Sequence, residues 1–400
     1  MSSNPTTSRG ASILWAQVCG LALVQGAIAL TWVIYNLYLV QLLESFGFPK
    51  ALATGLLIIE NLLAMVMEPL MGSFSDRLQH QVGTRFPLIS LGMVLSAGCF
   101  LAIPMVLLGG QATLFRWVLP LMLVAWALAM TVFRSPAMSL LGRYAFRTQL
   151  PLAAGILTLV GGLAGAMGPL ASQFILGLGP MAAFGIGSGV LIIAALTLTV
   201  IGPNRDVAGS SPATGGILAL PWGRLLWVFG TGVGVTLGFR LIMGTFPMVL
   251  KGQVPNSNPA TVMGTIFVTL ALTAIPSGAL AVRLGNRRAM MIGLGGMALV
   301  CAAVIAIHST AMGMVLAALF GASFSLVSNG TIPFALSMVP TEKAGLGTGI
   351  YFSGGALASS LFGALFGGSL ALTPALGAGL GSGAFLLAAL CVGLSTGRSR

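Results

Sequence analysis

The sequence predicts an all-α polytopic membrane protein, because long uncharged segments dominate it. Three such runs, Thr148–Asn204, Ala289–Thr341 and Ala344–Gly397, each exceed 50 residues. One helical crossing of a bilayer needs roughly 20 apolar residues, so each run is long enough to cross twice. Hydrophobic residues make up 57% of the chain and charged residues 6%, whereas a soluble domain carries roughly 25% charged residues. Lone strands would leave backbone groups unpaired in hydrocarbon, so helices are expected.

Twelve helical spans follow from the positions of these apolar segments along the chain. In order, they are expected near residues 13–43, 51–74, 87–109, 117–141, 152–177, 180–202, 224–250, 258–282, 288–308, 312–338, 345–369 and 374–396.

The basic residues predict the orientation, because short cytoplasmic loops are enriched in Lys and Arg. With both termini cytoplasmic, the cytoplasmic segments hold Arg9, Arg77, Arg85, Arg143, Arg147, Arg205, Arg224, Arg283, Arg287, Arg288, Lys343, Arg398 and Arg400. The outer segments hold only Lys50, Arg116 and Lys251. We therefore expect an integral protein of the plasma (inner) membrane. The net charge of +12 reflects these loops and does not indicate nucleic-acid binding.

The chain divides near its middle into two similar halves. The loop-like composition at 203–223 predicts a cytoplasmic linker between six-helix bundles at 1–202 and 224–400. A glycine and an arginine recur after the second span of each half, as Gly72 with Arg77 and as Gly278 with Arg283, at a constant offset of 206 residues. Further glycines and arginines follow each pair: Gly83 and Arg85 in the first half, and Gly285, Arg287 and Arg288 in the second.

On these repeated segments the chain resembles the major facilitator superfamily, which places Gly-x-x-x-Asp-Arg/Lys-x-Gly-Arg/Lys-Arg/Lys between helices 2 and 3 and echoes it between helices 8 and 9. Here Asp76 supplies the acid, whereas Val282 replaces it in the second segment. Ser75-Asp76-Arg77 with Gly83-Thr84-Arg85 is similar to the sucrose–proton symporters. Glu68-Pro69-Leu70-Met71-Gly72 is similar to the glycoside–pentoside–hexuronide:cation symporters. The resemblance implies the major facilitator fold of two pseudo-symmetric bundles.

Asp76 and Arg77 are expected at the inner end of the second helix. An acid there can accept from free N–H groups at a helix N-terminus, where the helix dipole favours negative charge. The helix that begins near Gly345 is the expected partner, and such a contact would close an inner gate. A purely topological role for these charges is the alternative.

Four ionisable residues lie inside predicted spans, where charge is costly and is a functional candidate. At roughly 1.5 Å per residue, Glu60 lies about 13 Å deep, and Glu68 and Arg134 both lie about 25 Å deep. We expect Glu68 to pair with Arg134, as a structural ion pair or as a proton or cation site. Glu60 is a structural acid or a proton carrier, because burial disfavours its charged form.

Arg240, the fourth, is predicted either to bind a substrate hydroxyl or carboxylate, since a guanidinium suits such acceptors, or to neutralise Glu60. By the same resemblance, helices 1, 4, 7 and 10 would line a central cavity. Polar and aromatic residues that could contribute to substrate binding are Gln25, Tyr35, Asn329 and Tyr351.

These features predict a secondary transporter that works by alternating access, with proton- or cation-coupled uptake of a sugar, glycoside or related polar solute. An exporter of amphipathic compounds and a non-transporting scaffold or pigment-delivery protein are the alternatives. No Gly-Lys-Ser/Thr phosphate loop is present, and no catalytic or metal-ligand constellation is evident. We therefore expect a monomer without cofactor or metal, whose partners are the lipid bilayer, a small-molecule substrate and a coupling proton or sodium ion.

Overall fold

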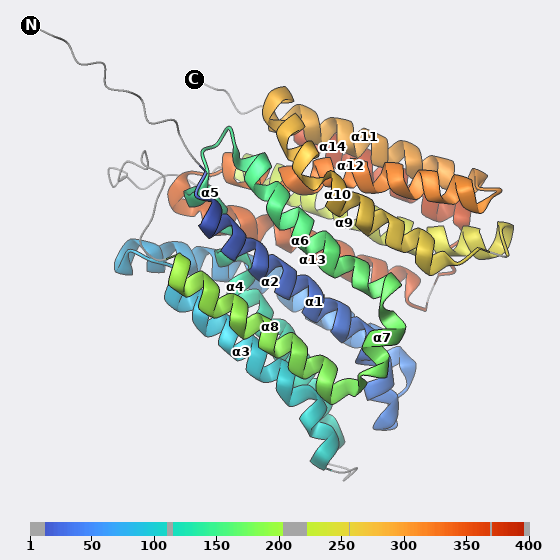
Figure 1. Cartoon of the computed structure of the whole chain (residues 1–400), viewed down its shortest axis with the longest axis horizontal. Helices are drawn as coiled ribbons and strands as arrows, with labels where there is room; N and C mark the ends of the chain where they lie inside the picture. Colours follow the sequence, from blue (N-terminus) through green and yellow to red (C-terminus); the bar gives the residue numbers. More distant parts are fainter. Residues whose placement is uncertain (1–12, 110–114, 203–221, 256, 369, 396–400) are drawn as a thin grey trace, which may run out of the picture.

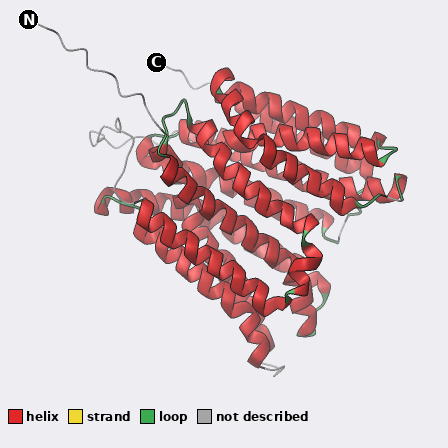
Figure 2. Ribbon diagram, in the orientation of Figure 1, coloured by secondary structure: helices red, strands yellow, loops and turns green. Residues whose placement is uncertain are grey.

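The structure is a computed structural model that describes residues 13–109, 115–202, 222–255, 257–368 and 370–395. Within these residues, twelve helices are long and apolar enough to cross a membrane, as the sequence predicts. Figure 2 shows helices joined by short loops. The long helices are α1 (Trp15–Ser45), α2 (Lys50–Val82), α3 (Phe86–Met105), α4 (Val118–Ser139), α6 (Leu150–Leu170), α8 (Gly179–Ile201), α9 (Trp222–Gln253), α10 (Pro259–Leu284), α11 (Asn286–Ala303), α12 (Thr310–Ser337), α13 (Ala344–Phe366) and α14 (Pro374–Leu394).

The repeated glycine–arginine segments lie within helices rather than in loops, which corrects the expected ends of two spans. Helix α2 continues past residue 74 to Val82 and stops at Gly83, whose φ is +80°. Helix α10 likewise continues to Leu284 and stops at Gly285, whose φ is +86°. No glycine or proline interrupts either helix after its repeated arginine, so the helix ends where glycine allows positive φ.

Two other expected spans are interrupted. The segment expected at 152–177 forms α6 and then the short α7 (Ser172–Gly177), with a break at Ala171. Pro169 lies just before this break, and proline removes a backbone donor that the helix needs. The segment expected at 117–141 ends at Ser139 and is followed by the short α5 (Leu141–Tyr144).

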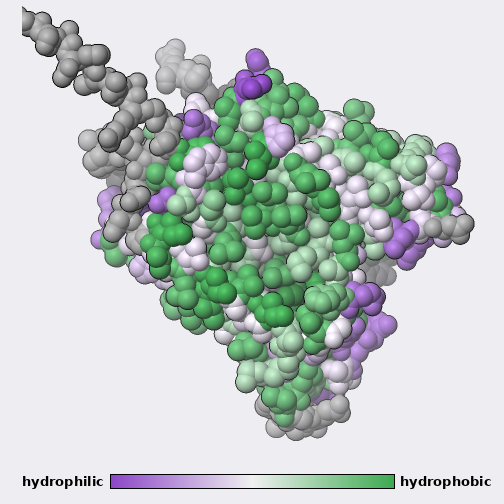
Figure 3. Space-filling view, in the orientation of Figure 1, coloured by the Kyte–Doolittle hydropathy of each residue, from purple (hydrophilic) through white to green (hydrophobic). Residues whose placement is uncertain are grey.

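The two halves have separate apolar cores. One cluster of buried side chains comes mainly from α1 to α8, and a second comes from α9 to α14. Most of the predicted linker, residues 203–221, lies outside the described residues, as do Arg9, Arg205, Arg398 and Arg400. In Figure 1 the halves fan apart toward the end where α7 lies. Figure 3 shows a broad apolar surface over the helices, with polar residues gathered toward their ends.

Two pairs of helices make the most extensive contacts between the halves: α2 packs against α13, and α6 packs against α10. Glycines allow the backbones to approach closely at both interfaces. A Cβ atom on Gly72 would overlap the carbonyl oxygen of Gly345, and one on Gly278 would lie 2.8 Å from the carbonyl oxygen of Pro151. Small residues at such positions are typical of membrane helix interfaces.

Candidate functional site

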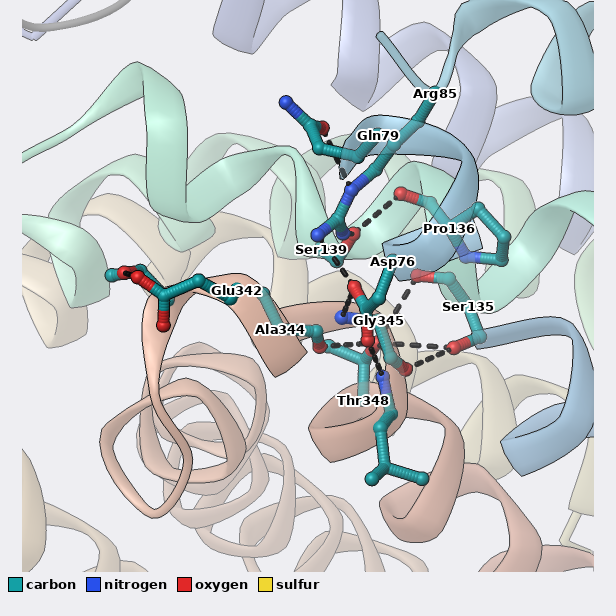
Figure 4. A network of polar contacts seen from close by, with 12 residues as sticks. Asp76, Gln79, Arg85, Ser135, Pro136, Ser139, Glu342, Ala344, Gly345 and Thr348 are labelled. Carbon is teal, nitrogen blue, oxygen red and sulfur yellow. Dashed lines mark hydrogen bonds and ion pairs between the residues drawn. The ribbon is translucent and has the colours of Figure 1, made fainter. Parts of the chain in front are cut away.

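Asp76 joins the two halves at one end of the molecule, which we call the Asp76 end. Its Oδ1 accepts from the backbone N–H of Gly345 at 2.9 Å, and its Oδ2 accepts from that of Leu346 at 2.8 Å. Both donors belong to the first turn of α13. The carboxylate therefore binds two N–H groups at a helix N-terminus, as the sequence predicts. Figure 4 shows this network.

Arg85 fixes the other side of Asp76. Its Nη2 lies 2.5 Å from Asp76 Oδ1, its Nε donates to Gln79 Oε1 at 2.9 Å, and its Nη1 donates to the hydroxyl of Ser139. Burial lowers the pKa of the Arg85 guanidinium, and the Asp76 carboxylate opposes that shift. Arg143 also donates to Gln79 Oε1, at 3.0 Å. These contacts hold α2 and α4 beside the start of α13.

Ser135 and Thr348 extend the network between the halves. The Ser135 hydroxyl on α4 donates to the carbonyl oxygen of Gly345 at 2.8 Å, and it lies 3.0 Å from the Thr348 hydroxyl. Both side chains are buried. These contacts could not be predicted from the sequence, because serine and threonine also occur in membrane helices where they bond only to their own backbone.

The equivalent position between α10 and α6 has no such acid. Gly278 contacts Pro151 in the same way that Gly72 contacts Gly345. Val282 therefore occupies the position that corresponds to Asp76, and Pro151 occupies the position that corresponds to Gly345. Proline has no N–H to donate. Leu152, the equivalent of Leu346, donates its N–H to the carbonyl oxygen of Gln149. The interface between α6 and α10 therefore closes through packing, while the one between α2 and α13 closes through a carboxylate.

The remaining residues of the repeated segments make fewer described contacts. Arg77, Arg283 and Arg288 have exposed side chains. Arg287 donates to the carbonyl oxygen of Gly393, which links the first turn of α11 to the end of α14. The gating role expected for these four arginines remains a prediction.

Glu68 and Arg134 form the expected pair. Arg134 Nη2 lies 2.6 Å from Glu68 Oε1, and its Nε donates to the same oxygen at 2.7 Å. The Glu68 side chain is fully buried, and its Oε2 has no hydrogen-bond partner among the described residues. The arginine also lies over the ring of Phe352 on α13, 4.7 Å from its centroid. This ion pair of the first half thus contacts the second half.

Glu60 has a different neighbour from the one expected. Its Oε1 accepts from the Tyr35 hydroxyl at 2.5 Å, and its Oε2 has no hydrogen-bond partner in the part of the chain that the structure describes. The Tyr35 ring stacks on Trp126 with centroids 4.6 Å apart. Glu60 is only 3% exposed. It is therefore a buried acid within the first half, bonded to a neutral group.

A cavity of about 360 Å³ lies between the halves. Its described lining carries no charged side chain. Polar groups come from Gln25, Thr158, Thr236, Ser328, Thr331 and Tyr351, and aromatic rings come from Phe239, Phe267, Phe324 and Phe352. Of the predicted substrate residues, Gln25 and Tyr351 are here. The four phenylalanines gave no signal in the sequence, because apolar rings on membrane helices resemble packing residues.

The other predicted substrate residues lie outside this lining. Tyr35 binds Glu60, and Asn329 is buried and donates to the carbonyl oxygen of Ala274 at 2.6 Å. Arg240 lies among the helices, but its side chain remains accessible to solvent. Among the described residues, no acid lies within ion-pair distance of it. It follows Phe239 and lies one turn beyond Thr236 on α9, so it shares the cavity-facing side of that helix.

Twelve membrane helices in two halves that enclose a cavity define a membrane transporter rather than an enzyme. The sequence model of the Major Facilitator Superfamily matches residues 21–360, and also residues 228–398. The chain therefore belongs to this superfamily. No curated protein matches the sequence.

Solved structures of transporters share the fold. FucP in the outward conformation is 11% identical, with a TM-score of 0.72, and the match covers 98% of this chain and all of that one. A variant of the E. coli fucose:proton symporter FucP is 13% identical, with a TM-score of 0.68 and coverage of 96% and 98%. The human organic anion transporter MFSD10 is 16% identical, with a TM-score of 0.67 and coverage of 95% and 99%.

Proposed function

We propose that the protein is a proton-coupled secondary transporter that takes up a small polar solute with an apolar face, such as a sugar or glycoside. The lining of the central cavity carries this proposal. Hydroxyl and amide groups suit the hydroxyls of a sugar, while phenylalanine rings suit its apolar face. The fold match to a fucose:proton symporter supports the same class of solute.

Glu68 is the proposed coupling acid. A coupling group must have a different environment in each state of the transporter, because a ligand shifts an equilibrium only through its differential affinity for the two states. Glu68 lies at the interface between the halves, since its carbonyl oxygen lies 2.5 Å from where a Cβ of Gly349 on α13 would be and its partner Arg134 lies over the ring of Phe352, so separation of α2 from α13 would change its surroundings. The described contacts of the Glu60 carboxylate, by contrast, stay within the first half.

Arg240 is proposed to contact the solute from beyond the Phe239 ring. Its freedom from an acidic partner, within the described part of the chain, favours this role over neutralising Glu60. A guanidinium can donate to sugar hydroxyls or hold a carboxylate. Two matched probes test this choice: p-nitrophenyl β-glucuronide carries a carboxylate at C6, where p-nitrophenyl β-glucoside carries a hydroxymethyl group.

The experiment is counterflow exchange of radiolabelled sugars in proteoliposomes, with a panel of sugars, the two nitrophenyl glycosides and cationic amphipathic drugs as competitors. We expect competition by a sugar or glycoside, and uptake that depends on an inward proton gradient. Arg240→Ala should weaken the competition, while Arg224→Ala, at an exposed position outside the repeated segments, should leave it unchanged. Exchange with none of these compounds would contradict the proposal and favour the scaffold function.

Export of amphipathic compounds is the second candidate. It is favoured by the four phenylalanines of the cavity, together with Met138 and Ile332 in the same lining, because flexible and aromatic side chains accept varied apolar ligands. Competition by the drugs alone, with movement against an inward proton gradient, would identify this function.

A further inference from the structure

Phe352 contacts both the central cavity and the buried ion pair. Its side chain belongs to the cavity lining, and the Arg134 guanidinium lies 4.7 Å from the centroid of its ring. This distance is within the range of a cation–π interaction, roughly 6 Å. The same guanidinium holds Glu68 Oε1 at 2.6 Å. One ring therefore separates the space for a solute from the arginine that neutralises Glu68.

The backbone beside this ring is fixed against α2. The hydroxyl of Ser353 donates to the carbonyl oxygen of Met65 at 2.5 Å, and Gly349 packs on the backbone of Glu68. The Phe352 ring itself is only partly buried. A solute can therefore move the ring by rotating its side chain while the helix stays in place, since a partly exposed side chain changes rotamer readily.

Among the described residues, the charged side chain that contacts the Glu68 carboxylate is that of Arg134. Glu60 and Asp76 lie eight residues away on α2, about 12 Å in either direction, and each has its own partner, Tyr35 and Arg85. From α13, the titratable residue beside Phe352 is Tyr351, which lines the cavity. Any change in how Arg134 holds Glu68 therefore acts directly on its protonation.

We propose that Phe352 is a positioning residue that transmits occupancy of the cavity to the Glu68–Arg134 pair, so that a bound solute favours protonated Glu68. The proposal rests on the proposed function in taking Glu68 as the coupling acid. A solute that packs on the ring draws it away from Arg134, and the arginine then holds the carboxylate less firmly. By linkage, protonation of Glu68 strengthens solute binding by the same factor. The loss of one cation–π contact corresponds to about a threefold to tenfold change in proton affinity.

The test fills the cavity covalently, so that it does not depend on knowing the solute. Ser328→Cys is introduced at the cavity wall in a protein whose four natural cysteines are alanine, and it is reacted with N-benzylmaleimide in lipid nanodiscs. Infrared spectroscopy follows the carboxyl band of protonated Glu68, which is assigned by its loss in Glu68→Gln. We expect the label to move the titration midpoint of this band to higher pH, by the threefold to tenfold change in proton affinity.

Phe352→Leu should abolish this shift, whereas Phe352→Tyr, which keeps an aromatic ring, should preserve it. Phe324→Leu is the matched control, because Phe324 lines the same cavity but stacks on Phe239 rather than on Arg134. Its shift should equal that of the parent protein. A shift that persists in Phe352→Leu, or a Glu68 band that does not respond to the label, would overturn the proposal.

The outcome is separable from the proposed function. If sugars fail to exchange but the Glu68 band shifts through Phe352, the coupling device stands and the solute class is wrong. If sugar uptake is proton-coupled but the shift survives in Phe352→Leu, only the role of Phe352 fails.

Discussion

Asp76 makes the strongest polar contacts between the halves. Its two oxygens accept from two backbone N–H groups of α13 while Arg85 supplies a countercharge. Charge-assisted hydrogen bonds are roughly twice as strong as neutral ones. Little solvent competes for the carboxylate, because the Asp76 side chain is only 9% exposed. Closure at this end therefore depends strongly on one side chain.

Replacing this acid should open the Asp76 end. Asp76→Asn keeps one acceptor but presents an amide donor to a second N–H group, and it leaves Arg85 without its countercharge. Leaving such buried groups unsatisfied costs about 1–3 kcal/mol, so the ratio of closed to open molecules should fall by at least about fivefold. Spin labels at His80→Cys and Thr341→Cys would report the distance between α2 and the segment before α13. Arg224→Ala, at an exposed position outside the repeated segments, is the control, and an unchanged distance distribution in Asp76→Asn would refute the role of Asp76 in closing this end.

Glu68→Gln should separate exchange from proton coupling. The glutamine can still accept a hydrogen bond from Arg134, but it cannot bind or release a proton. We expect counterflow exchange at near the parent rate and loss of uptake driven by a proton gradient. Glu60→Gln should retain both activities, since Glu60 bonds to Tyr35 inside the first half. The reverse result for the two variants would assign the coupling proton to Glu60.

The sequence predicted contacts of charged residues better than those of uncharged ones. Helical depth placed Glu68 and Arg134 at one level, and the structure confirms that they pair. Depth does not say which side of a helix faces a neighbour, so it could not show that Tyr35 would bind Glu60. Phe352 was not predicted, because a phenylalanine in an apolar helix carries no signal until its neighbours are known.

At the scale of helices, glycines control how closely α2 and α13 approach. Gly72, Gly345 and Gly349 lie where any side chain would meet the backbone of the other helix. Without hydrophobic exclusion to drive association in lipid, such close packing supplies much of the stabilisation. The sequence predicted twelve helices correctly from apolar length. It placed the end of α2 too early, at 74 rather than at Val82, because Gly83 and not the repeated charges ends that helix, while α10 ends at Leu284, close to the expected 282.

Adding one carbon at Gly345 should keep the Asp76 end from closing. In Gly345→Ala the new Cβ would lie 2.5 Å from the carbonyl oxygen of Gly72, and overpacking of this kind costs about 1–3 kcal/mol. The same spin-label pair should report a longer mean distance. Gly379→Ala is the matched control, since no atom lies within 4 Å of the added carbon there. A normal distance in Gly345→Ala would mean that the helices relax easily.

At the scale of the whole molecule, the two halves are related by an internal repeat, but their two interfaces are not equivalent. The interface of α2 with α13 has the Asp76 carboxylate at its end, while that of α6 with α10 has Val282 and Pro151 in the corresponding places. We infer that α6 and α10 stay packed as a pivot while α2 and α13 separate at the Asp76 end.

An acid added to the interface of α6 with α10 should not compensate for the loss of the Asp76 carboxylate. Val282→Asp would find no N–H at Pro151, and the N–H of Leu152 already donates to Gln149. We therefore expect that Val282→Asp will not restore closure to Asp76→Asn in the spin-label experiment. Restored closure would show that the second interface can supply donors of its own and that the asymmetry has little effect.

The uncharged lining of the cavity has an electrical consequence. The described lining itself holds no charged side chain, and any protein charge that moves with the loaded carrier moves back with the empty one, so a neutral solute adds no charge to the cycle. Under the proposed coupling, the proton alone would carry current. Moving one elementary charge is worth about 2.3 kcal/mol per 100 mV. Membrane voltage by itself could then concentrate a neutral solute roughly 50-fold for every 100 mV, even with no pH difference across the bilayer.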